Sequence, residues 1–455
     1  MKNGKRSSFS GKLGYVLAAA GASVGLGNIW RFTYLAAKYG GGIFLIIYIV
    51  LALTFGYTMI VAETAIGRMT RKSPVGAFKS FGKKKWLSFG GWINAVIPVL
   101  IVPYYSVIGG WVIKYLVEYF RGNAKLLAED GYFTDFISNG VSTELCFVAF
   151  CAFTLIIIFA GVQNGIERVS KIMMPILIVL SVIIAVYSVT RPGALEGVKY
   201  FLVPNVKNFS WMTVVAAMGQ MFYSLSIAMG ILITFGSYMK KDTAIEDSTR
   251  NVEIFDTGIA IMAGLMIIPA VFAFSGGDPD TLQAGPSLMF ITIPKVFQNM
   301  GFGTVIGIVF FLLVLFAAIT SSIALTESAV STFEDELGWG RKKATVLVGV
   351  IMLVLGSLSS LGYGPLAGIK IIGMQFLDLF DFLTNSVMMP IAALLTSLLV
   401  SRVVGIDKIE DEIIHGESAF RRKKVFVVMI KYLCPVFAII ILLSSVANAL
   451  GWIKM

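Results

Sequence analysis

Residues 21–28 read Gly21-Ala22-Ser23-Val24-Gly25-Leu26-Gly27-Asn28, and they lie in the middle of a long apolar run over residues 13–38. Three glycines and one asparagine so close together favour a break in a helix. Inside a lipid bilayer, the backbone groups that such a break releases find no water to bond. The stretch therefore predicts a membrane-spanning helix that is interrupted at its centre, where other polar groups satisfy the backbone.

A second stretch of the same kind follows at residues 219–230, which read GQMFYSLSIAMG. Glycines and small hydroxyl side chains again stand at the centre of an apolar run, five spans after the first break. Interruptions at equivalent positions of two halves indicate an inverted-repeat transporter with its binding site at the midplane. Close helix packing through small residues is the alternative; it explains the glycines but not Asn28 or the paired hydroxyls.

The composition places the whole chain in the membrane. Hydrophobic residues make up 57% of the 455 residues, charged residues make up 14%, and the mean hydropathy is +0.84. Soluble domains of this length do not have such a balance. We expect an all-α integral membrane protein, a single transmembrane transporter domain over residues 1–455, with about eleven spanning helices. The expected ranges are 13–38, 42–70, 89–119, 144–160, 166–189, 211–239, 247–274, 303–335, 343–361, 373–401 and 425–451.

The two breaks fall in the first and sixth of these helices, so the chain divides into two halves of five helices and one additional helix. We expect an inverted 5+5 repeat, with helices 1 and 6 broken at the midplane. Its first repeat is expected at about 10–190, its second repeat at about 210–402, and the extra helix at about 425–451. Half-helix amino termini attract a carboxylate and freed carbonyls coordinate sodium, so one such site can hold both charges of an amino acid.

The basic residues cluster in alternate loops. If the amino terminus is cytoplasmic, the inner segments collect Arg68, Arg71, Lys72, Lys79, Lys83, Lys84, Lys85, Arg168, Lys171, Lys240, Lys241, Arg341, Lys342, Lys343, Arg421, Arg422, Lys423 and Lys424. The positive-inside rule then fixes this orientation, and an odd number of spans puts the carboxyl terminus on the outer side. We therefore expect a multi-pass protein of the inner cell membrane, and the net charge of +11 needs no nucleic acid as partner.

Two outer segments, residues 190–210 and 275–302, are longer than the other outer connections and rich in Gly, Pro and Asp. We interpret them either as caps over an external vestibule or as ordinary loops.

Enzyme chemistry has no support in the sequence. All three cysteines stand inside apolar runs, and the single histidine, His415, lies in a charged loop. A zinc site or a histidine-based protease inside the membrane would need different residues. The chain is therefore not expected to be an enzyme.

An ordered set of motifs resembles one family of transporters. The motifs are GASVGLGNIWRF at 21–32, three glycines at 40–42, ETAIGR at 63–68, the break at 220–230, AAITSSIA at 317–324 and FEDEL at 333–337. Together they resemble the neurotransmitter:sodium symporter family, in particular its bacterial amino-acid members with eleven spans and the leucine-transporter fold. The resemblance covers nearly the whole chain.

The resemblance implies two sodium sites. The first would comprise the carbonyl of Ser23 together with Asn28, Ser224, Asp256 and the substrate's own carboxylate. The second would comprise the carbonyls of Gly21, Val24 and Ala317 and the hydroxyls of Thr320 and Ser321. Such all-oxygen sets suit a hard cation, although hydroxyls on an apolar helix can also bond back to their own helix. We therefore expect two Na⁺ ions.

Asp256 is an acidic residue inside an apolar span, which is costly unless the carboxylate is paired or functional. In chloride-dependent relatives, the resemblance implies a neutral residue here and a bound anion that supplies the charge. The fixed carboxylate of this chain would replace that anion, so no chloride is expected. Whether Asp256 also carries a proton on the return step stays open.

The resemblance also implies the substrate site. The carboxylate would be bound by the backbone amides of Leu26 and Gly27 and the hydroxyl of Tyr105, and the ammonium group by carbonyls near Ser23, Tyr223 and Ser224. The side-chain subsite would be formed by Ile101, Tyr105, Tyr223, Ser226, Met229, Ser321 and Leu325. This set is largely apolar and Met repacks easily. Gly25 favours an amino acid over an amine, because amine-transporting relatives carry an acidic residue at this position.

Two gates complete the resemblance. The outer gate would pair Arg31 with Asp381, with Tyr105 and Tyr223 as an aromatic lid, and the inner gate would pair Arg6 with Asp335. The chain departs from the family at two positions. Relatives usually have tryptophan in place of Phe9 and often glycine in place of Ala228. The methyl group of Ala228 should either reduce the space at the site or stiffen the break, and both effects disfavour the largest side chains.

These features predict a sodium-coupled symporter that imports a small hydrophobic or aromatic amino acid by alternating access. An amino-acid receptor, a sensor or a channel on the same fold is the alternative. The expected partners are the amino-acid substrate and membrane lipid, and a homodimer is left open.

Overall fold

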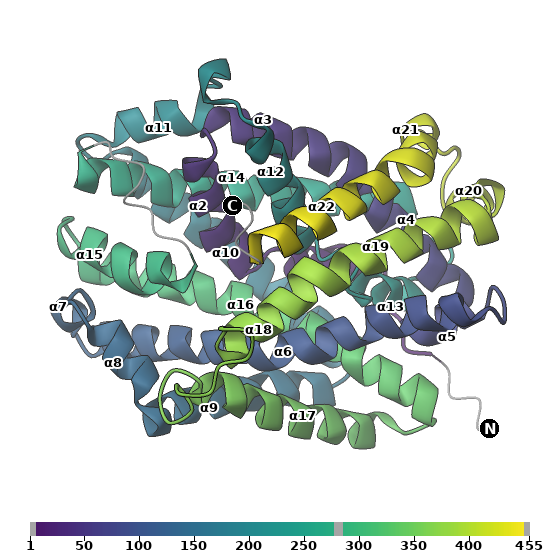
Figure 1. Cartoon of the computed structure of the whole chain (residues 1–455), viewed down its shortest axis with the longest axis horizontal. Helices are drawn as coiled ribbons and strands as arrows, with labels where there is room; N and C mark the ends of the chain where they lie inside the picture. The colour runs from purple at the N-terminus through teal and green to yellow at the C-terminus, as the bar shows by residue number, and fades with distance from the viewer. Residues whose placement is uncertain (1–5, 277–284, 450–455) are drawn as a thin grey trace.

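The computed structural model describes residues 6–276 and 285–449. Its long helices lie roughly along the longest axis of the molecule (Figure 1). Across the described ranges no β-strand is present, and two isolated β-bridges join Gly41 to Pro204 and Ile371 to Met374. The predicted all-α class is confirmed.

The elements before the second break are α1 (Lys12–Ser23), η1 (Gly27–Arg31), α2 (Phe32–Lys38), α3 (Gly42–Leu51), η2 (Ala52–Gly56), α4 (Tyr57–Thr70), α5 (Pro74–Lys79), α6 (Lys85–Phe120), α7 (Ala124–Leu127), α8 (Tyr132–Ser138), α9 (Gly140–Phe159), η3 (Val162–Glu167), α10 (Arg168–Val189), α11 (Ala194–Leu202), η4 (Val206–Asn208) and α12 (Trp211–Ser224). Those after it are α13 (Ile231–Tyr238), α14 (Ile245–Ser275), η6 (Leu288–Thr292), α15 (Ile293–Gln298), α16 (Gly303–Leu337), α17 (Arg341–Leu361), α18 (Phe376–Asp381), η7 (Phe382–Met388), α19 (Met389–Leu398), η8 (Leu399–Val404), α20 (Ile406–Ile414), α21 (Lys423–Val428), η9 (Met429–Leu433) and α22 (Cys434–Ala449).

The predicted spans and the observed helices correspond closely. Within the described residues, nine helices are long and apolar enough to cross a membrane, and α1 with the Gly27–Lys38 segment makes a tenth, bent by 53°. The third span begins at Lys85 instead of residue 89, because this helix continues past its apolar window into a lysine-rich turn. Residues 450 and 451 of the last predicted span lie outside the described residues.

The sixth predicted span consists of two short pieces. α12 ends at Ser224 and α13 begins at Ile231. With 14 and 8 residues, each is shorter than the roughly 20 residues that a spanning helix needs. Together they occupy the range predicted for one broken helix. The count of eleven crossings and the division into two repeats stay predictions.

The backbone between α12 and α13 adopts an unusual conformation. Ser226 has φ 53°, Ala228 has φ 57° and Gly230 has φ 71°, and this left-handed region costs a non-glycine residue roughly 1–2 kcal/mol. The N–H of Ala228 donates to the Glu63 carboxyl oxygen Oε1 at 2.7 Å, and the Ser226 hydroxyl donates to the carbonyl of Ala22 at 2.9 Å. The second break is therefore held by the first break and by α4.

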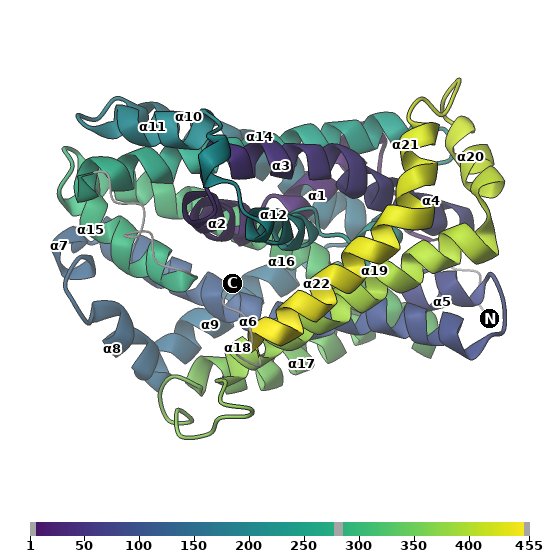
Figure 2. The same ribbon diagram turned by 45° about the horizontal axis from the view of Figure 1, so that its top comes forward.

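Seven of the short helices lie at the two ends of the molecule. α7, α8, α11 and α15 lie at one end, and α5, α20 and α21 lie at the other, in both views (Figures 1 and 2). The segments that the sequence assigns to the outside, 190–210 and 275–302, contribute α11 and α15 to the first end. Residues 277–284 of the second segment lie outside the described residues. Both segments thus contain short helices.

Candidate functional site

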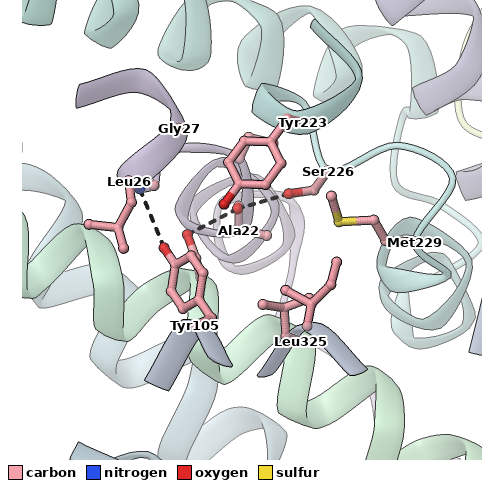
Figure 3. A pocket seen from close by; sticks show the side chains of 12 residues that line it. Ala22, Leu26, Gly27, Tyr105, Tyr223, Ser226, Met229 and Leu325 are labelled. Carbon is pink, nitrogen blue, oxygen red and sulfur yellow. Dashed lines mark hydrogen bonds between the residues drawn. The ribbon is translucent and has the colours of Figure 1, made fainter. Parts of the chain in front are cut away.

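A small cavity lies where the two helix breaks meet α6 and α16 (Figure 3). Its volume is about 30 Å³, a space on the scale of a water molecule. It is lined by Ala22, Ser23, Gly25, Leu26, Gly27, Ile101, Tyr105, Tyr223, Ser226, Met229, Ser321 and Leu325. The structure therefore brings together ten of the eleven residues that the sequence suggests for substrate. The exception is Ser224, which faces a neighbouring cluster.

The Leu26 N–H and the Tyr105 hydroxyl lie together at one side of this cavity (Figure 3). The Leu26 N–H lies 3.3 Å from the hydroxyl oxygen of Tyr105, and both groups are predicted to bind a carboxylate. Met229 and Leu325 lie on the opposite side in this view. The arrangement suits a ligand with a polar head and an apolar side chain.

Two glycines make room for the cavity. A Cβ atom on Gly25 would lie 2.6 Å from the hydroxyl oxygen of Ser321 and 3.1 Å from that of Tyr105. A Cβ atom on Gly27 would lie 2.4 Å from the ring of Tyr223. Protein atoms do not pack so closely, so a side chain at either position would displace the residues that line the site.

Asp256 of α14 is the centre of a buried polar cluster. The Asn28 amide nitrogen donates to its Oδ1 at 2.8 Å, the Ser224 hydroxyl donates to the same oxygen at 2.8 Å, and Asn28 also contacts Ser224 at 2.9 Å. Three of the four residues predicted for the first sodium site therefore meet. The fourth, Ser23, lines the adjacent cavity, and its hydroxyl donates to Ala19 in its own helix at 3.1 Å.

Tyr48 of α3 is a member of this cluster that the sequence did not reveal. Its hydroxyl donates to Oδ2 of Asp256 at 2.8 Å and lies 3.0 Å from the Ser224 hydroxyl. Both carboxylate oxygens thus accept hydrogen bonds, as a buried charge requires. A tyrosine inside an apolar run has the appearance of a packing residue, and only the fold brings it to Asp256.

Replacing Tyr48 with phenylalanine should weaken sodium binding. The change removes the donor to Oδ2 of Asp256, and a buried acceptor left unpaired costs about 1–3 kcal/mol, so we expect the apparent sodium affinity to fall about tenfold. Sodium titration of substrate binding measures this effect. The control is Tyr432→Phe, since Tyr432 is 65% exposed; equal sodium affinities in the two variants would contradict the assigned role.

A second group of oxygen atoms lies where α1 ends against α16. The Ser321 hydroxyl oxygen is 3.3 Å from the carbonyl oxygen of Gly21 and 3.4 Å from that of Val24. The Thr320 hydroxyl lies 3.2 Å from the carbonyl of Ala317 in its own helix, so the back-bonding that the sequence left open is present. All five predicted ligands of the second sodium site are oxygen donors in this one region, a set that fits sodium better than a transition metal.

The predicted inner gate is a direct contact. Arg6 Nη1 lies 2.5 Å from Asp335 Oδ1, Nη2 donates to the Ser331 hydroxyl at 2.8 Å, and the guanidinium carbon lies 5.0 Å from the ring centroid of Tyr238. Phe9 is 1% exposed and packs edge to face against Tyr238. Phenylalanine therefore fills the position at which the family resemblance implies tryptophan.

The predicted outer gate is arranged differently. The Arg31 guanidinium carbon lies 5.2 Å from the ring centroid of Tyr223. Asp381 accepts hydrogen bonds from Asn385 at 2.5 Å and from the Tyr104 hydroxyl at 3.2 Å. Within the described part of the chain, no ion pair joins Arg31 to Asp381, and both line a cavity of about 450 Å³. The outer ion pair stays a prediction.

This larger cavity has the position of a vestibule. Tyr223 lines both cavities, and Gly285 and Pro286 of the outer segment 275–302 contribute to the wall of the larger one. The contacts are thus closed at the end that holds Arg6, and the wide cavity lies on the other side of Tyr223.

Two further buried residues support the breaks. Gln220 donates to the carbonyl of Gly27 at 2.9 Å, and Glu63 accepts from the Ala228 N–H. Both belong to motifs that carry the family resemblance, yet neither residue was assigned an individual role from the sequence alone. A polar residue within an apolar segment was the available signal, and its partner was visible only in three dimensions.

The apolar helices, the two breaks and the buried oxygen clusters between them define a secondary transporter of the membrane. The chain belongs to the Sodium:neurotransmitter symporter family, whose model matches residues 6–127 and 134–452. This confirms the predicted family and the prediction that the chain is not an enzyme.

Named relatives agree with this assignment. The chain is 34% identical to the uncharacterized sodium-dependent transporter YhdH of Bacillus subtilis, covering 98% of this chain and 99% of the relative. It is 26% identical to the human sodium- and chloride-dependent GABA transporter 2, covering 90% of this chain and 75% of the relative. The crystal structure of MhsT in complex with L-phenylalanine matches with a TM-score of 0.86 and 35% identity, covering 97% of this chain and 100% of MhsT.

Proposed function

We propose that this chain is a sodium-coupled symporter that imports a small hydrophobic or aromatic amino acid by alternating access. The observation that carries the proposal is the cavity at the two breaks, which ten of the eleven suggested substrate residues line. MhsT, at 35% identity, was crystallised with L-phenylalanine, an amino acid of the proposed class.

The chemistry of the lining supports this substrate class. Ile101, Met229 and Leu325 provide apolar surface for a side chain, and the Leu26 N–H and the Tyr105 hydroxyl provide donors for a carboxylate. Met229 can adapt this lining to side chains of different size, because its thioether is flexible.

Two sodium ions are proposed to couple to each substrate. The Asp256 cluster and the oxygen group around Ser321 would hold one ion each, and the carboxylate of the substrate would complete the first site. Each charge gains about 2.3 kcal/mol per 100 mV, and each tenfold gradient adds about 1.4 kcal/mol. Two ions would then supply roughly 7 kcal/mol, enough for a substrate gradient of about five decades.

The carboxylate of Asp256 also supports chloride independence, because the cluster already contains a fixed negative charge.

For the orientation in the membrane, we propose a cytoplasmic amino terminus and an outer carboxyl terminus. The inner-gate pair, Arg6 and Asp335, lies beside the lysine-rich segment that follows α5, since Lys79 at the end of α5 bonds Glu336 at 2.7 Å. Gate and basic loops therefore share one end of the molecule, which agrees with the positive-inside rule.

Uptake into proteoliposomes tests the proposal. A labelled panel of leucine, methionine, phenylalanine, tyrosine, tryptophan, glycine and 4-aminobutyrate would be offered with an inward sodium gradient, a potassium gradient or no gradient, each with and without chloride. We expect concentrative uptake of an apolar amino acid that requires sodium but not chloride. Sodium-dependent binding without accumulation would support a receptor or sensor instead, and flux that never exceeds equilibrium would support a channel.

A further inference from the structure

The first residues of the chain are held at more points than the Arg6–Asp335 gate. The Lys240 ammonium group donates to the carbonyl of Ser10 at 2.7 Å, and the Gln163 side chain donates to the carbonyl of Ser8 at 2.7 Å. The segment that precedes α1 is thus bound both by the residues between α13 and α14 and by η3, the turn before α10.

Glu167 contacts the same segment through both of its carboxylate oxygens. This residue ends the η3 turn directly before α10, and it is 2% exposed. Its Oε2 accepts a hydrogen bond from the backbone N–H of Ser10 at 2.9 Å, and its Oε1 accepts one from the Ser10 hydroxyl. Carboxylate hydrogen bonds of this kind are stronger than those between neutral groups.

The sequence of α1 is adapted to this carboxylate. The helix has no acidic residue in its first turn, and its N-cap, Gly11, provides no side-chain cap. Glu167 therefore brings, from another helix, the negative charge that a helix amino terminus favours. Gly14 leaves the space for it, because a Cβ atom there would lie 2.4 Å from the carboxyl carbon of Glu167.

The hydrogen bonds between Glu167 and Ser10 can also break at a low cost in free energy. Lys171, one turn further along α10, lies 2.7 Å from Oε1 of Glu167 and 3.3 Å from the Ser10 hydroxyl. When Ser10 leaves, the carboxylate keeps this charged partner, so the large penalty of an unpaired buried charge does not arise. Such an arrangement suits a contact that forms and breaks in every cycle.

We propose that Glu167 is a positioning residue of the inner gate. It holds Ser10 and the start of α1 against α10, so that opening toward the inner side requires release of Ser10 as well as separation of Arg6 from Asp335. This role rests on the alternating access proposed above. The contact between Glu167 and Ser10 would be a second contact that must break, in addition to the Arg6–Asp335 pair that the family resemblance implies.

Distance measurement between two spin labels tests this role without any transport assay. The labels are placed on cysteines that replace Ser7 and Lys84, both exposed, in a chain whose native Cys146, Cys151 and Cys434 are replaced by alanine. In sodium without amino acid, the unmodified gate should give mainly the short distance. Glu167→Gln should raise the ratio of long to short distances about tenfold, because it removes a charged acceptor.

Three further variants make the outcome decisive. Ser10→Ala, which leaves the backbone N–H in place, should give a smaller increase, and adding it to Glu167→Gln should change little more. Glu196→Gln, a change of an exposed glutamate on α11 at the opposite end, should leave the distances unchanged.

If Asp335→Asn lengthens the distance while Glu167→Gln only lowers the melting temperature, Glu167 is structural and the inference is wrong. If neither variant changes the distance, the amino-terminal segment is not a gate and alternating access at this end fails as well.

Discussion

Asp256→Asn is expected to lower sodium-driven uptake by at least about 100-fold, which corresponds to about 2.7 kcal/mol. The carboxylate is fully buried and accepts hydrogen bonds from Asn28, Tyr48 and Ser224. An intramembrane charge of this kind is costly unless it serves a partner, and sodium is the proposed partner. Asparagine keeps the size of the side chain but removes the charge, so the site would lose most of its attraction for a cation. Initial uptake rates over a range of sodium concentrations measure the effect.

The matched control is Asp130→Asn. Asp130 is an aspartate of the loop between α7 and α8, its side chain is 92% exposed, and exposed ion pairs contribute little. We expect its uptake to equal that of the unmodified protein. Chloride provides a second comparison, because a mobile anion can supply the charge that Asp256→Asn removes. Partial recovery of uptake in chloride is therefore expected for that variant alone. An unchanged sodium requirement in Asp256→Asn would contradict the assigned site.

The parts of the fold that follow from local sequence were predictable. Apolar windows mark the long helices, and the glycine-rich stretch at 21–28 coincides with the bend between α1 and η1. Helix ends were less certain, because hydropathy reports where lipid begins and not where the helical backbone stops. The fourth span thus begins at Gly140, where Asn139 caps the helix, and not at residue 144.

Site residues that belong to a sequence motif were predictable. Site residues that only the fold brings together were not. Ser321, Thr320 and Gly21 were assigned through motifs that the family shares. Tyr48 was missed because its partner, Asp256, lies 208 residues further along the chain. Sequence patterns report neighbours along one helix, whereas a polar pair between two helices depends on how those helices pack.

Ion pairs were the least predictable feature. Arg6 contacts Asp335, but Arg31 lies over the ring of Tyr223, and Asp381 bonds Asn385 and Tyr104 instead. Charged side chains at the wall of a wide cavity have several partners of similar energy. Which partner each charge contacts depends on how the helices pack around the cavity, and a sequence pattern does not report this packing.

Gly25→Asp is expected to weaken binding of an apolar amino acid by more than about 100-fold, since both sterics and charge oppose it. The added Cβ would lie 2.6 Å from the Ser321 hydroxyl oxygen and 3.1 Å from that of Tyr105. The new carboxylate would then stand next to the Leu26 N–H and the Tyr105 hydroxyl, where the carboxylate of the substrate is proposed to bind. Two like charges in one buried site repel strongly. Equilibrium binding of labelled phenylalanine measures the loss.

Two further variants separate the steric effect of Gly25→Asp on binding from its electrostatic effect. Gly25→Ala adds the Cβ without the charge and should weaken phenylalanine binding by only about tenfold, because the Ser321 hydroxyl can rotate away. Gly258→Ala on α14, where a Cβ would meet nothing within 4 Å, should leave binding unchanged. Phenethylamine, which lacks the carboxylate, should lose far less affinity than phenylalanine in Gly25→Asp, since the side chain itself now supplies the negative charge. If both ligands lose affinity equally, the effect of Gly25 is steric alone, and this glycine does not select substrates with their own carboxylate.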